Sequence, residues 1–107
     1  MQYMINLKDF GEDNRYVGYF VTLKEQQYTF KVRWSSYCNC AFLDIEDMNG
    51  EAIIMGRALV NNLKIRNNKL PYILYFRHIN NKTYEPRLDN LSEEFAIFYD
   101  DGEVANG

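Results

Sequence analysis

The stretch from Tyr28 to Gly56 constrains the fold more than any other part of the sequence. In its first part apolar residues alternate with polar ones: Tyr28, Phe30, Val32 and Trp34 with Thr29, Lys31 and Arg33. Because successive side chains of a strand point to opposite faces, this pattern predicts a strand with one buried and one solvated face. Two further strand-like runs, 40–46 and 51–55, flank Asn49-Gly50, a pair that accepts the positive φ of tight hairpin turns. The stretch therefore predicts an antiparallel meander.

Short strand patterns continue on both sides of this meander. We expect strands over Gln2–Lys8, Tyr16–Leu23, Tyr72–Arg77 and Phe95–Tyr99. Tyr72–Arg77 is the most apolar and is expected to be central, and both faces of Tyr16–Leu23 are apolar enough for a strand between two layers. Residues 61–68 are polar and allow a short helical turn. No segment keeps a 3.6-residue apolar period, so we predict an all-β fold: a small antiparallel β-sandwich or a semi-open β-barrel of about seven short strands.

The chain length and its two ends suggest a simple organisation. A sequence of 107 residues fits a single β domain over 1–107, with an acidic and flexible C-terminal tail over 100–107. No apolar run is long enough to span a membrane, and the N-terminus lacks a signal-peptide pattern. We therefore expect no membrane contact and synthesis in the cytoplasm.

The residue types that support metal binding or catalysis are sparse. Cys38, Cys40 and His78 are the soft metal ligands of the sequence, fewer than a structural zinc site needs. His78 has no recognisable nucleophile motif or phosphate-binding loop to serve. We predict no metal, no cofactor and no catalytic residues.

Four carboxylates crowd the predicted hairpin, at Asp44, Glu46, Asp47 and Glu51. Such clusters occur in enzymes or lectins that handle sugars, which is one alternative function. Asp44 and Glu46 alternate with Leu43 and Ile45, however, so the period-two pattern favours a solvated strand face.

Binding of single-stranded nucleic acid by a small barrel is a second alternative. Aromatic residues make up 16% of the chain and could stack on bases. The net charge of −3 weighs against this function, and Lys31 and Arg33 lie opposite the aromatic face of their own strand. Nucleic acid is therefore an unlikely partner.

A pattern of strand and turn residues runs from about Phe20 to Tyr99: Gln27-Tyr28-Thr29-Phe30, Trp34, Phe42 to Gly50, Ile53, Gly56, Ala58-Leu59-Val60, Asn62-Leu63, Leu74, Glu85-Pro86 and Ile97-Phe98-Tyr99. This pattern resembles the phage baseplate plug family, small β-rich proteins of contractile-tailed phages and related prophage particles.

The resemblance implies a structural protein of the virion tail baseplate, near the hub or spike, made in the host bacterial cytoplasm. It carries no catalytic residues onto this sequence. The implied partners are tail hub, spike or tube proteins of the same particle, with several copies possible in the assembly. We expect contacts from the polar stretches 61–69 and 78–91, at Asn62, Leu63, Arg66, His78 and Tyr84.

Overall fold

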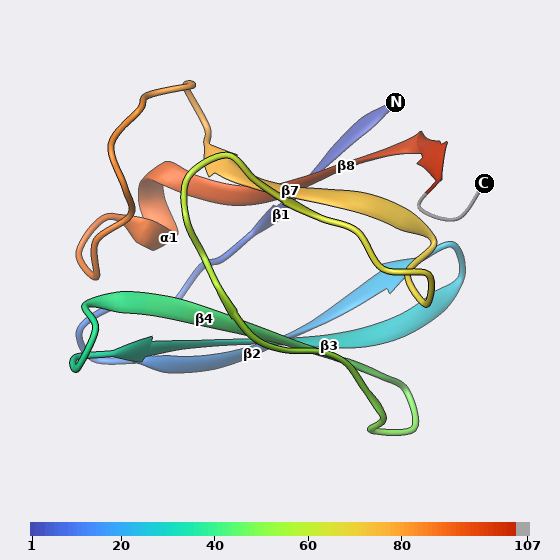
Figure 1. Ribbon diagram of the computed structural model, residues 1–107, viewed down its shortest axis with the longest axis horizontal. Coiled ribbons are helices and arrows are strands. Elements are labelled where there is room, and N and C mark those ends of the chain that lie inside the picture. Colours follow the sequence, from blue (N-terminus) through green and yellow to red (C-terminus); the bar gives the residue numbers. More distant parts are fainter. Residues whose placement is uncertain (105–107) are drawn as a thin grey trace.

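Two four-stranded antiparallel sheets pack face to face as a sandwich (Figure 1). The computed structural model describes residues 1–104. The first sheet has the order β1-β8-β7-β6 and the second the order β2-β3-β4-β5. The elements are β1 (Gln2–Asn6), β2 (Tyr16–Leu23), β3 (Gln26–Ser35), β4 (Cys40–Asp47), β5 (Ala52–Ala58), β6 (Leu63–Ile65), β7 (Tyr72–His78), the short helix α1 (Leu91–Glu94) and β8 (Phe95–Val104). The prediction of a small all-β sandwich is confirmed, with eight strands in the described residues, and the sheets do not close into a barrel.

The predicted meander forms most of the second sheet. β3 and β4 pair in a continuous register that sets Phe30 opposite Ile45 and Lys31 opposite Asp44. At the β4–β5 turn, Asp47 Oδ1 accepts the N–H groups of Asn49 and Glu51, both at 2.9 Å, and Gly50 has φ +80°. The Asn-Gly signal therefore marks the hairpin correctly.

The core lies between the two sheets and receives large side chains from both. Phe30, Leu43 and Ile45 point into it from the second sheet, and Leu74, Phe76 and Ile97 from the first. Each of these six residues is fully buried. The apolar alternation in the sequence is thus the pattern of the inner sheet faces.

β2 lies differently from its prediction. It is an edge strand that pairs with β3, and its outward side chains are in solvent rather than between two layers. Phe20 is 79% exposed and Tyr16 is 59% exposed. The apolar character of both faces therefore reflects an uncovered aromatic surface, not burial on both sides.

The acidic segment after Tyr99 also differs from the expected flexible tail. β8 continues through it, with Asp100 opposite Gln2 and Val104 opposite Tyr72. The Gly102 N–H donates to Asp100 Oδ1 at 2.8 Å, so a local turn accommodates the acidic residues within the strand pairing. Residues 105–107 of the expected tail lie outside the described residues.

The polar stretch 61–68 contains strand β6 and not a helical turn. Leu63 and Ile65 pair with Phe76 and Leu74 of β7, so their alternation serves the inner face of the first sheet. The helix α1, between the long 79–90 connection and β8, was not predicted. With four residues it is too short to show a helical period.

The β2–β3 turn joins Leu23 to Gln26 through two non-glycine residues with positive φ, Lys24 (+49°) and Glu25 (+68°). Such a turn favours Asn-Gly, because other side chains cost about 1–2 kcal/mol each in the left-handed region. We expect the double substitution Lys24→Asn and Glu25→Gly to stabilise the protein by about 1–2 kcal/mol in urea denaturation. The pair Lys24→Ala and Glu25→Ala is the control. It removes the same side chains and retains the unfavourable φ, so an equal gain there would contradict the explanation.

Candidate interaction surface

Two connections meet at one end of the sandwich, the short residues 59–62 after β5 and the long residues 79–90 after β7 (Figure 1). We call them together the loop end. Asn61 joins them: its N–H donates to Glu85 Oε1 at 2.9 Å, and its Nδ2 donates to the carbonyl oxygens of Lys82 (2.7 Å) and Tyr84 (3.0 Å). Its Oδ1 also accepts the His78 N–H at 3.2 Å. One amide side chain therefore fixes both connections to the end of β7.

His78 forms a second anchor beneath the loop end. The residue is 2% exposed, and its ring packs edge-on against Tyr84 and Phe95. Nδ1 accepts the Asn80 N–H at 2.9 Å, which places the ring proton on Nε2. Nε2 lies 3.0 Å from Tyr84 Oη and 3.2 Å from Glu94 Oε1, so it can donate to either.

Tyr84 and Glu94 complete this cluster with a hydrogen bond from the tyrosine hydroxyl to the carboxylate. The bond from Tyr84, and then that from His78, lowers the pKa of the Glu94 carboxyl, and the same carboxylate raises the pKa of Tyr84. All of these groups have partners within the fold. The cluster therefore ties the 79–90 connection to α1 and has the character of a structural support.

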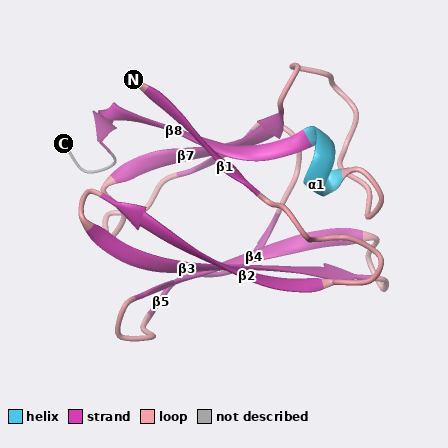
Figure 2. Cartoon of the chain, turned by 180° about the vertical axis from the view of Figure 1, so that it is seen from behind, coloured by secondary structure: helices cyan, strands magenta, loops and turns pink. Residues whose placement is uncertain are grey.

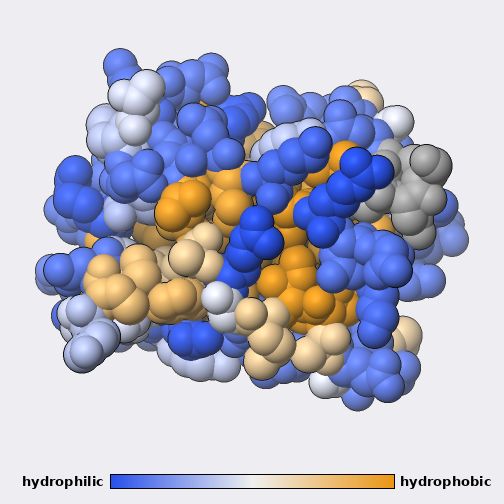
Figure 3. All heavy atoms as spheres, viewed as in Figure 1, coloured by the Kyte–Doolittle hydropathy of each residue, from blue (hydrophilic) through white to orange (hydrophobic). Residues whose placement is uncertain are grey.

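The outward side of the loop end is partly apolar. Val60 is 46% exposed, Tyr84 42% and Ile79 39%. Figure 3 shows hydrophobic residues on this face of the molecule, along the zone between the sheets, with hydrophilic residues around them. Apolar side chains on rigidly held loops are a typical feature of protein interfaces.

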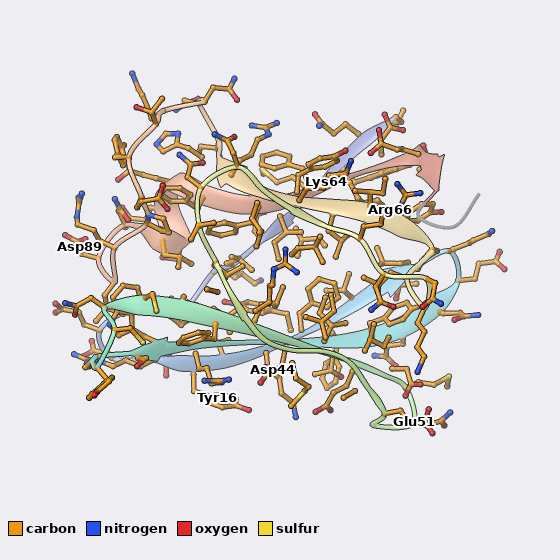
Figure 4. The ribbon with its side chains drawn as sticks, viewed as in Figure 1. Tyr16, Asp44, Glu51, Lys64, Arg66 and Asp89 are labelled. Atoms are coloured by element: carbon orange, nitrogen blue, oxygen red, sulfur yellow. The ribbon has the colours of Figure 1, made fainter. Side chains whose placement is uncertain are left out.

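The predicted contact residues fall into three situations. Asn62 and Tyr84 are exposed at the loop end, as a contact requires, and Asn62 has φ +63°. Leu63 packs against the core from β6 and His78 is buried, and whether either residue contacts a partner stays a prediction. Arg66 lies apart from them: Figure 4 places it at the opposite end from Asp89, which belongs to the 79–90 connection.

Sequence reasoning missed Asn61, the residue that organises the loop end. The available signal was the tract Asn61-Asn62 directly after an apolar run, since amide side chains often satisfy the backbone groups of loops. The sequence alone does not say which of the two amides points inward.

The outer face of the second sheet carries two of the carboxylates considered for sugar chemistry, Asp44 and Glu46, while Asp47 and Glu51 lie at the β4–β5 turn. Asp44 is 6% exposed, so it is not solvated as expected. Its Oδ1 accepts the Gly56 N–H at 2.6 Å and its Oδ2 lies 3.5 Å from Arg33 Nε. Glu46 pairs with Lys31 at 2.9 Å. Figure 4 shows Asp44 and Tyr16 on this outer side.

These pairs also bear on nucleic-acid binding. In the sequence of β3, Lys31 and Arg33 lie on the face opposite the aromatic residues of that strand. On the outer face of the folded sheet, however, they lie beside aromatic residues of the neighbouring strands, Tyr16, Phe20 and Phe42. Both cations are nevertheless matched by carboxylates, and the Arg33 guanidinium lies 5.1 Å from the centre of the Phe42 ring. The face therefore has little uncompensated positive charge for phosphates.

The two cysteines are free thiols near the β3–β4 turn, far from His78 in the sequence. Hydrogen bonds with Ser35 and then Cys40 lower the pKa of the exposed Cys38 thiol, whereas burial raises that of Cys40. Within residues 1–104 no three histidine, cysteine or acidic side chains gather closely enough to hold a metal ion.

A cavity of about 350 Å³ lies between the β2–β3 turn and residues 68–71, at a distance in the fold from the loop end. Its walls include Leu23, Tyr28 and Leu70 together with charged residues of the turn. None of the predicted contact residues lines it, so it adds nothing to the candidate surface.

Comparison with known proteins identifies the family of this sequence. Residues 4–103, nearly the whole chain, match the family described as cyanophage baseplate Pam3 plug gp18. No curated protein matches. The match covers both sheets and the loop end, so the fold and the candidate surface described above lie within the region that defines the family. The chain belongs to this family of phage baseplate plug proteins.

Proposed function

We propose that this protein is a structural subunit of a phage tail baseplate that acts through contacts with neighbouring particle proteins near the tail hub or spike. The observation that carries the proposal is the family match over residues 4–103. The titratable groups discussed above support it, because His78, Glu94, Asp44 and Glu46 are engaged in contacts that stabilise the fold.

We place the docking contact at the loop end. Its connections are held by Asn61 and His78, so Val60, Ile79 and Tyr84 are presented with little loss of conformational freedom on binding. The partners in this proposal are hub, spike or tube proteins of the same particle. The protein then resides in the virion tail baseplate after synthesis in the bacterial host, and it works without catalysis or cofactor.

No helix in residues 1–104 has the length and apolar composition needed to cross a membrane.

Charged substitutions at the loop end should prevent incorporation into particles. We expect Val60→Asp combined with Ile79→Asp to reduce the amount of this protein in purified particles at least about tenfold, because a buried unpaired charge at an interface costs more than 1.4 kcal/mol. The measurement is quantitative mass spectrometry of particles made by a gene-deleted phage complemented with each variant.

Met48→Asp is the control, because Met48 is an exposed apolar residue at the β4–β5 turn, outside the loop end. It should be incorporated at the normal level, and all variants should keep the far-ultraviolet circular dichroism of the native chain. Normal incorporation of the loop-end variant would exclude docking there. Absence of the native protein from purified particles would exclude the baseplate role itself.

A further inference from the structure

β2 has a free edge with an uninterrupted row of backbone hydrogen-bonding groups. Leu23 and Gln26 close a two-residue turn and so form a hydrogen-bonded pair, which directs the N–H and C=O of every second residue, Val21, Tyr19 and Val17, toward β3. The Trp34 N–H donates to the Arg15 carbonyl at 2.8 Å, which continues the same phase. The intervening residues turn their backbone groups to the free edge: Tyr16, Gly18, Phe20 and Thr22.

The features that normally prevent edge pairing are absent from β2. Its eight residues, Tyr-Val-Gly-Tyr-Phe-Val-Thr-Leu, include no charge and no proline, and its pairing with β3 has no bulge. Natural proteins usually protect free edges with such devices, because an open apolar edge pairs with other chains. Figure 2 shows β2 from the side on which this edge lies.

Two of the other three sheet edges, β5 and β6, are protected. β5 is interrupted by bulges in its pairing with β4 and carries Arg57. β6 has three residues with Lys64 at its centre. β1 has no charge, proline or bulge either, but its five residues offer a shorter edge than the eight of β2. β2 is thus the longest unprotected edge of the described chain, which makes it the edge best suited to pair with another strand.

The β2 edge is complementary to itself. In an antiparallel pair of two copies, a register that sets Gly18 opposite Phe20 of the second copy also sets Tyr16 opposite Thr22, and uses the free N–H and C=O of all four residues. Each Phe20 ring then covers the glycine across from it, an arrangement that stabilises strand pairs. Because the strand has no charge, the two-fold symmetry brings no like charges together.

We infer that two copies of this chain associate through antiparallel pairing of their β2 edges, which joins the two second sheets into one eight-stranded sheet. The interface is isologous, with two-fold symmetry. It lies on strand β2 and leaves the loop end free, so the inference does not depend on the proposed docking to baseplate partners.

Sedimentation velocity of the purified full-length chain over a micromolar concentration range tests this inference. We expect a monomer–dimer equilibrium for the native protein and a dimer affinity at least about tenfold lower for Gly18→Pro and for Phe20→Lys. Proline at position 18 removes an outward N–H without removing a β2–β3 bond. Lysine at position 20 removes the aromatic ring and places two like charges at diagonal positions on one face of the strand pair.

Met55→Lys is the matched control, because Met55 is an exposed apolar residue on β5, the opposite edge of the same sheet. This variant should dimerise as the native chain does. A native protein that stays monomeric over the whole range overturns the inference, as does a dimer that both β2 variants leave intact or that Met55→Lys also abolishes. If Gly18→Pro fails to fold by circular dichroism, Phe20→Lys decides.

Discussion

Replacing Asp44 with alanine should destabilise the protein by about 2–4 kcal/mol, although the residue lies on an outer sheet face. The carboxylate is almost completely buried and accepts the Gly56 N–H at 2.6 Å, within the bulged part of β5 where Gly56 has φ +64°. Without it the amide and the Arg33 guanidinium lose their common partner. A buried donor left without an acceptor costs more than the mean value of a hydrogen bond.

Two other substitutions separate the contributions to this effect. Asp44→Asn keeps an acceptor for Gly56 and loses the charge, so its cost should be about half that of alanine. Glu46→Ala removes a neighbouring carboxylate on the same face, whose pairing with Lys31 is more exposed, and should cost less than about 1 kcal/mol. The measurements are urea denaturation and hydrogen exchange of the Gly56 amide. Equal costs for Asp44→Ala and Glu46→Ala would contradict this account.

The sequence was informative where one local rule decides the structure. The alternation from Tyr28 to Trp34 and the Asn49-Gly50 turn sufficed to predict the meander, because strand periodicity and hairpin φ angles are properties of neighbouring residues. Most of the family resemblance came from the same stretch, and the match over residues 4–103 confirms the family.

Features that depend on pairing between strands far apart in the sequence could not be predicted from local rules. The extension of β8 through the acidic segment depends on β1 and β7, whose registers set Asp100 opposite Gln2 and Val104 opposite Tyr72. The burial of Asp44 likewise depends on how the bulge at Gly56 covers a strand face that alternation alone marks as solvated. The edge position of β2 follows from the division of strands between the sheets.

The candidate surface was predicted only in outline. Asn62 and Tyr84 are exposed at the loop end, but Asn61 and His78 face inward and position it. Polar composition does not distinguish the exposed residues from the inward-facing ones. A loop uses amide and imidazole groups to hydrogen-bond its own backbone as well as to contact a partner. Their role as partner contacts stays a prediction.

Replacing His78 with alanine should have the second large effect, a loss of about 3 kcal/mol of unfolding free energy. The substitution leaves a cavity beside Phe95 and removes the acceptor of the Asn80 N–H and the donor to Tyr84 and Glu94. The Asn61 contact to the His78 N–H involves the backbone and persists. The 79–90 connection should therefore loosen while the sheets remain formed.

The two nitrogens of His78 can be separated with amide side chains. In His78→Asn the Oδ1 atom replaces Nδ1 as acceptor for Asn80, and in His78→Gln the Nε2 atom replaces the ring donor to Tyr84 and Glu94. Each should recover about 1 kcal/mol relative to alanine, because each restores one side of the cluster. Urea denaturation gives the energies, and limited proteolysis within residues 79–90 reports the loosening, which should be strongest for alanine. If His78→Ala is no more sensitive to protease there than the native chain, His78 does not hold the loop end. The proposed docking surface would then owe its rigidity to Asn61 alone.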